Sequence, residues 1–447
     1  MSKKADAEEL LAHVERRNPG QSEFHQAVRE AARDLVPLVN DRAEYRDARV
    51  LDRLVEPDRV VQFRVCWQDD AGRVQINRGY RVQFCNAIGP YKGGLRFHAS
   101  VEPGTLKFLA FEQTLKNSLT DLPMGGAKGG ADFSTRGRSE AEVMRFCQAF
   151  MTQLHHYIGE DVDIPAGDIG VGVREVGFLF GQYKRLIGAF EGALTGKPLA
   201  SGGSHVRSEA TGWGCAYFAQ NVLSQAGADL DGKTAVVSGS GNVALHAAVK
   251  LRALGARVIS LSDSDGTVHA PDGFDDEQLE GARRIKQEER GRISAFAEKF
   301  GLEYRKGATP WRIPCDLAFP CATQNEIGEK DARELIDNGC ELVCEGSNMP
   351  CTAEASELFS KADVIHAPGK AANAGGVAIS GLEITQNAMR MRWSRQEVDA
   401  RLQEIMRTIH ETCVEHGERS GGIDYRRGAN VGGFIKVADA LVHGGIV

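Results

Sequence analysis

One short segment restricts the fold of this chain more than any other, and it reads G-S-G-N-V-A at 239–244. A β-branched run at 234–238 precedes it, a helical pattern at 243–254 follows, and a second strand-like run lies at 257–261. The G-x-G-x-x-A spacing allows a tight turn, a close approach of backbone to a pyrophosphate, and close packing of helix on strand. The segment predicts a βαβ unit that binds a dinucleotide at the helix N-terminus. The contacts expected from this turn are Gly239, Ser240, Gly241, Asn242 and Val243.

The residues that face the adenosine ribose decide which dinucleotide is bound. Asp263 lies 24 residues after Gly239, and an acidic group there usually binds the ribose hydroxyls of NAD and repels a 2′-phosphate. Against this, the small Ser262 and Ser264 leave room for a phosphate. The segment that follows carries a basic cluster of Arg283, Arg284, Lys286, Arg290 and Arg292. On the residues alone, this cluster either folds over the ribose or forms a solvated helix face.

The length of 447 residues exceeds what one core usually holds, so two domains are expected. A Gly-rich segment at 195–204 resembles a hinge between them. We expect an α/β fold with the active site in the cleft between the domains. Residues 1–200, completed by a C-terminal helix at 425–447, form the first domain, and residues 201–424 form the dinucleotide-binding domain. The expected elements of the first domain are helices at 5–17, 21–40, 102–119 and 432–442 and strands at 59–67 and 74–85.

Three lysines lie among glycines and apolar residues, where solvated lysines are unusual. They are Lys92, Lys116 and Lys128, in Y-K-G-G-L-R-F, F-E-Q-T-L-K-N and P-M-G-G-A-K-G-G. Several ammonium groups in a small site favour a small, multiply anionic substrate, and burial beside like charge lowers a lysine pKa, as proton transfer requires.

Two further positions near these lysines have open interpretations. Gln113 and Lys116 share one stripe of the helix at 102–119, and this stripe either points into a cleft or emerges into solvent. Asp168, in D-I-P-A-G-D-I-G-V-G, is either a second proton-transfer group or an ordinary turn residue.

Composition limits the partners. A net charge of −7 and a pI near 6.0 argue against nucleic acid or an anionic membrane surface. No apolar run approaches the roughly 18 residues of a membrane span, and the N-terminus turns acidic where a signal peptide turns apolar. The ten cysteines include no C-x-x-C pair, and nothing completes a zinc site around Cys340 and Cys344. Reduced thiols, no metal and a cytoplasmic location are therefore expected.

At this point the chain resembles a known family, the hexameric small-subunit glutamate dehydrogenases, in their NADP-using branch. The resemblance covers essentially the whole length in long blocks. These blocks are V-Q-F-C-N-A-I-G-P-Y-K-G-G-L-R-F-H at 82–98, K-F-L-A-F-E-Q-T-L-K-N at 107–117, P-M-G-G-A-K-G-G at 123–130, D-I-P-A-G-D-I-G-V-G at 163–172, S-G-S-G-N-V-A at 238–244 and A-P-G-K-A-A-N-A-G-G-V-A-I-S-G-L-E at 367–383. Ala127 and Ser347 depart from the pattern of that branch.

The resemblance implies reversible oxidative deamination of L-glutamate to 2-oxoglutarate and ammonia, with NADP as cofactor, in a homohexamer. It implies roles for individual residues as well. For the substrate, Lys92 and Ser380 hold the side-chain carboxylate, Gln113 and Lys116 hold the α-carboxylate, and Gly167 contributes backbone. For the chemistry, Lys128 is the acid/base lysine and Asp168 manages protons on ammonia. The cofactor is contacted by Thr211, Asn242, Ser262, Lys286 and Asn348.

Two other functions fit parts of the sequence. A branched-chain or aromatic amino-acid dehydrogenase is expected to lack a cation at Lys92 and a hydroxyl at Ser380, and this chain has both. A catalytically dead cofactor-sensing or scaffold protein has no use for Lys128 together with Asp168.

Overall fold

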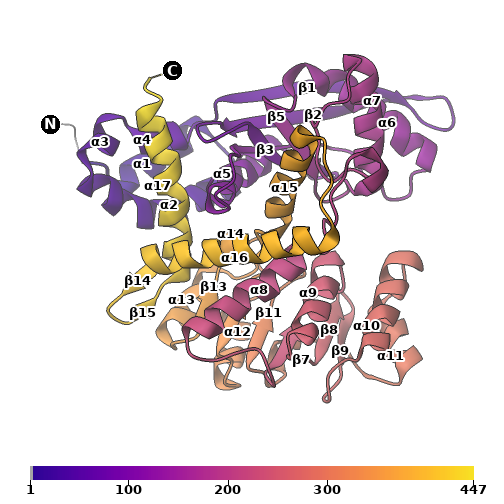
Figure 1. The fold of residues 1–447 in the computed structure, drawn as a ribbon, viewed down its shortest axis with the longest axis vertical. Coiled ribbons are helices and arrows are strands. Elements are labelled where there is room, and N and C mark those ends of the chain that lie inside the picture. The colour runs from indigo at the N-terminus through magenta and orange to yellow at the C-terminus, as the bar shows by residue number, and fades with distance from the viewer. Residues whose placement is uncertain (1–3, 447) are drawn as a thin grey trace. The chain divides into compact units, whose positions relative to one another are not determined.

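The computed structural model describes residues 4–446 and divides into two compact units, coloured along the chain in Figure 1. The first unit consists of three stretches, which are the residues up to His205, Ile379–Val398 and the residues from Asn430 onward. The second unit consists of Val206–Ala378 and Asp399–Ala429. The helices α15 (Gly375–Met389), α16 (Arg395–Gly417) and α17 (Tyr425–His443) each contribute to both units.

These bounds differ from the predicted ones at residues 379–398, which we had expected in the dinucleotide-binding domain. The physical reason is a buried ion pair within the first unit. Glu383, on α15, lies 2.7 Å from Lys197 Nζ and also accepts a hydrogen bond from Gly196 N at 3.0 Å. Thr195 and Lys197 are buried, so this part of the Gly-rich segment is packed against α15 and is not an exposed linker.

The first unit is built on a mixed five-stranded sheet with the order β1-β2-β4-β3-β5. The antiparallel pairs are β1 with β2 and β2 with β4, whereas β4, β3 and β5 run parallel. The strands are β1 (Arg59–Gln68), β2 (Val74–Cys85), β3 (Tyr91–Phe97), β4 (Gly126–Ala131) and β5 (Asp163–Gly167).

Aromatic side chains form much of the core of the first unit. Phe146, from α6, stacks on Phe133 with ring centroids 3.7 Å apart, and Phe97 and Trp67 meet Phe146 edge to face. Burial of such rings is the main favourable term in packing helices on a sheet. The other helical elements of this unit are α1 (Ala7–Arg17), α2 (Ser22–Asp41), α3 (Ala43–Asp47), α4 (Val50–Leu54), α5 (Pro103–Leu119), α6 (Glu140–Leu154), η1 (His155–Tyr157), α7 (Val173–Ile187) and η2 (Leu199–Ser201).

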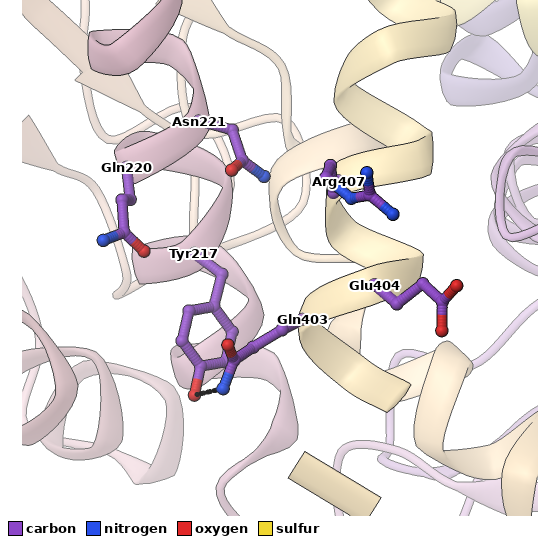
Figure 2. A pocket seen from close by; sticks show the side chains of 6 residues that line it. All are labelled: Tyr217, Gln220, Asn221, Gln403, Glu404 and Arg407. Carbon is purple, nitrogen blue, oxygen red and sulfur yellow. Dashed lines mark hydrogen bonds between the residues drawn. The ribbon is translucent and has the colours of Figure 1, made fainter. Parts of the chain in front are cut away.

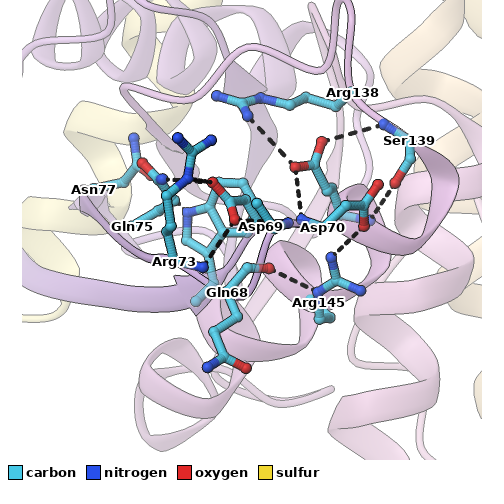
Figure 3. Close-up of polar contacts among 12 residues, drawn as sticks. Gln68, Asp69, Asp70, Arg73, Gln75, Asn77, Arg138, Ser139 and Arg145 are labelled. Atoms are coloured by element: carbon cyan, nitrogen blue, oxygen red, sulfur yellow. Dashed lines mark hydrogen bonds and ion pairs between the residues drawn. The ribbon is translucent and has the colours of Figure 1, made fainter.

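A polar network fixes the tip of the β1–β2 hairpin on α6 (Figure 3). Asp69 accepts hydrogen bonds from Arg73 N at 2.9 Å and from Arg73 Nε at 3.0 Å. Asp70 accepts one from Arg145 Nη2 at 2.6 Å, and its own N–H donates to Glu142 Oε1 at 3.2 Å. Because β1 is an edge strand, these bonds hold a hairpin that is paired on one side only.

The C-terminal helix α17 packs on the N-terminal helices within the first unit. Phe434, Val437 and Ala438 lie on one face of this helix and are buried, and Leu441 on the same face is half-buried. The ring of Phe434 lies 5.9 Å from that of Tyr45, edge to face.

The second unit is built on a parallel five-stranded sheet with the order β13-β12-β11-β6-β7. Its strands are β6 (Thr234–Val237), β7 (Arg257–Val258), β11 (Leu317–Phe319), β12 (Leu342–Cys344) and β13 (Ile365–Ala367). A helix joins β6 to β7, β11 to β12, and β12 to β13, as in a doubly wound α/β domain. The helical elements are α8 (Ala210–Gln225), α9 (Asn242–Ala253), α10 (Asp276–Arg283), η3 (Arg284–Glu288), α11 (Ile293–Phe300), η4 (Pro310–Arg312), α12 (Glu329–Asp337), α13 (Ala353–Lys361) and α14 (Gly369–Ala372).

The strand predicted at 257–261 is in fact divided between two sheets. Ile259 N still donates to Ala235 O at 2.9 Å, but Ile259 O accepts from Ala270 N at 2.9 Å. The chain therefore leaves the parallel sheet at this residue. The remainder becomes β8 (Ser260–Asp263), which pairs with β9 (Gly266–His269) in an antiparallel sheet completed by β10 (Glu303–Lys306). A short hairpin of β14 (Glu418–Arg419) and β15 (Gly422–Ile423) follows α16.

Within residues 4–446, no helix is both long enough and apolar enough to cross a membrane.

Candidate functional site

Three parallel strands of the first unit place Lys128, Gly94 and Asp168 side by side. Leu95, in β3, pairs with Gly129 in β4 and with Gly167 in β5. The residues adjacent to these partners therefore lie at one level of the sheet, although they are distant in the sequence. Asp168 follows directly after β5, so its side chain lies at the carboxyl end of that strand.

Asp168 is held between two cations. Its Oδ1 lies 3.3 Å from Lys128 Nζ, and its Oδ2 accepts a hydrogen bond from Arg96 Nε at 2.7 Å. Burial by itself raises the pKa of Asp168, but the charges of Lys128 and Arg96 outweigh it and lower the pKa to about 2. This carboxylate is therefore ionised throughout the physiological range.

Lys128 is 4% exposed, and its surroundings change its basicity. Burial lowers the pKa of Lys128 below the ordinary range of lysine, and the Asp168 carboxylate offsets only part of that effect. Arg96 and Arg81 lower it further. Lys128 consequently loses its proton more readily than a solvated lysine, which is what a proton-transfer group requires.

Gly94 provides the space in which these groups meet. A β-carbon at this position would lie 2.8 Å from Gly167 O, 2.9 Å from Asp168 Cβ and 3.3 Å from Lys128 Nζ. Any side chain here would press on the backbone of Gly167 and on the carboxylate, so the glycine is explained by the close approach.

Asn117 connects α5 to β3 and brings Gln113 towards Lys92. Its Nδ2 donates to Lys92 O at 3.1 Å and also to Gly125 O, and its Oδ1 accepts from Gln113 Nε2 at 2.6 Å. Lys92 itself is 1% exposed. The polar end of the α5 stripe is therefore bonded to the lysine-bearing strand and does not simply emerge into solvent.

Lys116 and Ser380 belong to the same unit. Lys116 is half-buried on α5, and Ser380 is buried on α15. A β-carbon on the adjacent Gly381 would lie 2.5 Å from Leu122 Cδ1 and 3.0 Å from Met124 Cε. This turn of α15 therefore lies against the segment that leads into β4.

Two residues of this group were not predicted from the sequence. Arg96 could have been found, because it lies in the same Gly-rich block as Lys92 and is also a cation among apolar residues. Asn117 offers a weaker signal, a polar residue between Lys116 and an apolar helix end.

In the second unit, the fingerprint turn joins β6 to α9 as predicted. Gly239 has φ +83°, a left-handed conformation that favours glycine, and Gly241 caps α9. A β-carbon on Gly241 would meet nothing within 4 Å. The first turn of α9 therefore opens on free space, and its N–H groups have no acceptor within the helix. This arrangement fits a pyrophosphate.

Asp263, at the end of β8, is engaged by several donors. Its Oδ2 accepts from Ile293 N at 3.0 Å and lies 3.3 Å from Lys286 Nζ, which belongs to the π-helical turn η3. Burial raises the pKa of Asp263, but backbone donors and then Lys286 outweigh it, so the pKa is lowered. Ser262 Oγ accepts from Gly239 N at 2.9 Å, which places Ser262 directly at the fingerprint turn.

The basic cluster at 283–292 was expected either to fold over the ribose or to form a solvated helix face, and different members do each. Arg283 and Arg284 form exposed ion pairs with glutamates of their own segment, as a solvated face does. Lys286 and Arg292 instead fold back on the end of β8, where Arg292 Nη1 donates to Ser264 Oγ at 2.9 Å.

Thr211 and Asn348 lie near the same edge of this unit. A β-carbon on Gly212, next to Thr211, would lie 2.6 Å from Val243 O, so α8 contacts the start of α9 closely. Asn348 follows β12, and its Oδ1 accepts from Asn373 Nδ2 at 3.0 Å. Because β6, β11 and β12 are parallel, their carboxyl ends meet at the edge that carries the fingerprint.

A hollow of about 300 Å³ lies elsewhere in the second unit, between α8 and α16 (Figure 2). None of the predicted site residues lines it. The lining is polar, and Gln403 Nε2 donates to Tyr217 Oη at 3.1 Å across it. The lining residues are Tyr217, Gln220, Asn221, Gln403, Glu404 and Arg407.

Family models match most of the chain. Residues 57–185 match the model for the Glu/Leu/Phe/Val dehydrogenase dimerisation domain, and residues 202–445 match that for Glutamate/Leucine/Phenylalanine/Valine dehydrogenase.

Individual relatives extend over nearly the full length. The chain is 54% identical to the NADP-specific glutamate dehydrogenase of Escherichia coli, covering 98% of both chains. It is 52% identical to the NAD-specific glutamate dehydrogenase of Bacteroides fragilis, covering 98% of this chain and 99% of that one. The crystal structure of Plasmodium falciparum glutamate dehydrogenase is 48% identical and superimposes with a TM-score of 0.96, covering 99% of this chain and 95% of that one.

Proposed function

Since the chain belongs to the Glu/Leu/Phe/Val dehydrogenase family, we propose that it is an NADP-dependent glutamate dehydrogenase. It interconverts L-glutamate, water and NADP⁺ with 2-oxoglutarate, ammonium, NADPH and a proton. The observation that carries the proposal is the ion pair of Lys128 and Asp168 in the same sheet as the buried Lys92. One sheet thus presents a lysine suited to proton transfer and a second cation that can bind a carboxylate of the substrate.

The substrate residues follow from the charges of the molecule. 2-Oxoglutarate is a dianion, so a site selective for it needs a cation for each carboxylate. Lys92 and Ser380 bind the side-chain carboxylate, Gln113 and Lys116 bind the α-carboxylate, and Gly167 contributes backbone. Two opposite charges at about 4 Å attract by roughly 4 kcal/mol at an effective dielectric of about 20, which favours a dicarboxylate over a monocarboxylate.

The chain's own groups handle the protons. The chemistry that NADP supplies when bound is hydride transfer at the substrate α-carbon, which no side chain can perform. Once that carbon is an iminium, neutral Lys128 takes a proton from the attacking water, which leaves a carbinolamine. The nitrogen then receives a proton, the hydroxyl loses its own, and the C–N bond breaks with release of ammonia and the ketone. Asp168, ionised and held by Arg96, stabilises the ammonium and guides its protons.

The pH profile of kcat/KM for glutamate oxidation tests the coupling of Lys128 to its neighbours. Activity should fall as pH drops through the pKa of Lys128, because the protonated amine accepts no proton. Arg96→Gln removes a cation that lowers this pKa, so the acid limb should move to higher pH. Asp168→Asn removes a carboxylate that raises it, so the limb should move to lower pH. Shifts in the same direction, or none, would contradict this assignment.

For the cofactor, Thr211, Asn242 and Asn348 join the fingerprint residues Gly239, Ser240, Gly241 and Val243. Asp263 does not block a 2′-phosphate in this arrangement, because its charge is already engaged by Lys286 and by backbone N–H groups. Ser262 leaves space, and Lys286 supplies the cation. Relatives of similar identity are named for NADP and for NAD, so the residues around Asp263 carry the argument for NADP.

A direct assay tests the function. Purified protein with 2-oxoglutarate and ammonium should oxidise NADPH, seen as loss of its absorbance, and should do so faster than NADH at equal, subsaturating concentrations. No turnover with either cofactor would overturn the proposal, and faster turnover with NADH would overturn the NADP preference.

Lys286→Glu should raise the KM for NADPH far more than that for NADH. A charged hydrogen bond contributes about 1.5–3 kcal/mol, so its loss corresponds to roughly 10- to 100-fold in KM for NADPH. Arg283→Glu is the matched control, because Arg283 is a half-buried cation of the same segment that pairs with Glu280 and Glu288. Equal effects of the two substitutions on NADPH would remove Lys286 from the phosphate site.

We also place the enzyme in the cytoplasm as a homohexamer. The ten cysteines are free thiols, nine of them buried, as suits a reducing compartment. The edge hairpin exposes Val60, Val74 and Ile76, and the family model matched by this region is a dimerisation domain. An apolar edge of this kind supports association between copies.

A further inference from the structure

A glutamate, a cysteine and a histidine meet in the second unit, outside the residues assigned to the cofactor. Glu345 follows β12, His366 lies on β13, and Cys351 precedes α13. A carboxylate oxygen, a sulfur and a ring nitrogen from these residues all lie within 4.8 Å of one another. Glu345 and Cys351 are 5% and 9% exposed.

The backbone holds all three positions. His366 pairs with Val343 in the parallel sheet, and Glu345 N donates to Ala367 O at 3.0 Å. Cys351 forms a bridge with Ile327, and the flanking Thr352 N donates to Ile327 O at 3.0 Å. Backbone pairing with β13 and with Ile327 therefore fixes the positions from which the three side chains converge.

The charge of Glu345 is incompletely compensated. Its Oε1 lies 2.9 Å from His366 Nε2, and its Oε2 accepts from Gly369 N at 2.6 Å. Across the described residues 4–446, no lysine or arginine forms an ion pair with it. The Gly369 N–H and the Cys351 thiol are neutral donors to this carboxylate, so a bound cation would add the positive charge that these hydrogen bonds do not supply.

The chemistry of the donors selects the cation. We propose that Glu345, Cys351 and His366 bind one Zn²⁺ ion per chain. Thiolate, imidazole and carboxylate are all ligands of Zn²⁺, whereas Ca²⁺ and Mg²⁺ prefer oxygen donors alone. On binding, the Cys351 thiol releases its proton to solvent as the Zn–S bond forms, and water takes the fourth position.

The geometry requires only small movements. Tetrahedral Zn²⁺, with bonds of about 2.0 Å to N and O and about 2.3 Å to S, places its ligand atoms roughly 3.3–3.7 Å apart. Atoms already within 4.8 Å of one another reach that spacing by side-chain shifts of about 1 Å. The cysteine spacing led us to expect no metal, because these three ligands lie apart in the sequence without the paired spacing of common zinc motifs.

The site also adjoins the loop at 345–350 that carries Asn348. Asn373 Nδ2 donates to Ser347 O at 3.1 Å and to Asn348 Oδ1, and Gly369, which binds Glu345, begins the same short helix α14. A metal ion on Glu345 is therefore anchored at the base of a loop that we assign to cofactor binding.

Cobalt serves as the spectroscopic probe. Full-length protein, stripped with EDTA and dialysed, should develop a thiolate-to-cobalt charge-transfer band that saturates at one Co²⁺ per chain and is lost on adding one equivalent of Zn²⁺. Cys351→Ser should abolish the band. His366→Gln should weaken Zn²⁺ binding by at least about tenfold, since even outer partners of metal ligands typically cost 10- to 100-fold. Cys66→Ser, which removes the exposed thiol, should keep the band.

Circular dichroism and NADPH-dependent turnover establish that each variant is folded, and turnover is read separately from metal binding. If Cys351→Ser does not fold, His366→Gln and Cys66→Ser decide the question. No band in the unmodified protein, a band that persists in Cys351→Ser, unchanged affinity in His366→Gln, or a band lost in Cys66→Ser would each overturn the proposal.

Discussion

Lys128→Ala is expected to lower kcat by about 10²-fold or more while NADPH binding is unchanged. Lys128 is buried, lies 3.3 Å from Asp168, and has a lowered pKa, the combination that suits it to transfer protons. A group that acts only in the chemical step lowers kcat without a matching rise in the KM for cofactor. Steady-state kinetics in both directions, with NADPH binding followed by fluorescence, separate the two effects.

Lys184→Ala is the matched control, because Lys184 is an exposed lysine on α7 of the same unit. It should keep near-native kcat. Asp168→Asn should lose kcat as Lys128→Ala does, since it keeps the shape of the side chain and removes the charge. A Lys128→Ala enzyme with near-native kcat would remove this lysine from the chemistry.

The sequence predicted Lys128 and Asp168 as proton-transfer candidates but not their contact. Lys128 and Asp168 were each recognisable by the glycines around them, yet each alone has an ordinary interpretation. What joins them is the register of β4, β3 and β5, in which Leu95 faces both Gly129 and Gly167. Register depends on long-range pairing, which local patterns do not encode.

The contact of Arg96 and the division of the strand at 257–261 also depend on long-range pairing, so local patterns did not predict them. Arg96 alternates with Leu95 and Phe97 as any strand residue does, and only the fold shows that it reaches Asp168. The run at 257–261 contains no glycine, proline or asparagine, so nothing local marks the point where it leaves one sheet for another.

Residues 379–398 are where a linear division of the chain and its compact units differ. The Gly-rich segment predicts a boundary near residue 200, and the first continuous stretch of the first unit extends to His205. The return of α15 to that unit rests on the buried pair of Lys197 and Glu383, which are 186 residues apart. Neither residue differs, in the sequence, from an ordinary charged residue at a surface.

The second large effect concerns substrate choice, through the double substitution Lys92→Leu and Ser380→Val. It removes the cation and the hydroxyl proposed for the side-chain carboxylate and leaves apolar groups of similar size. Hydrogen bonds to charged groups contribute about 1.5–3 kcal/mol each, so kcat/KM for glutamate should fall by roughly 10²- to 10⁴-fold. The glutamate carboxylate would also lose its solvation without compensation, because Lys92 and Ser380 are both buried.

The same change should admit an apolar side chain. Norleucine and methionine match glutamate in length without its charge, and measurable oxidation of either is expected from the double variant. Lys107→Leu is the control, because Lys107 is a half-buried lysine on the same helix, α5, and donates a hydrogen bond to Asn18 Oδ1. It should leave glutamate kinetics near native. If the double variant keeps the glutamate KM and kcat, the side-chain carboxylate is bound elsewhere, and the buried charge of Lys92 must be explained by its contacts within the sheet.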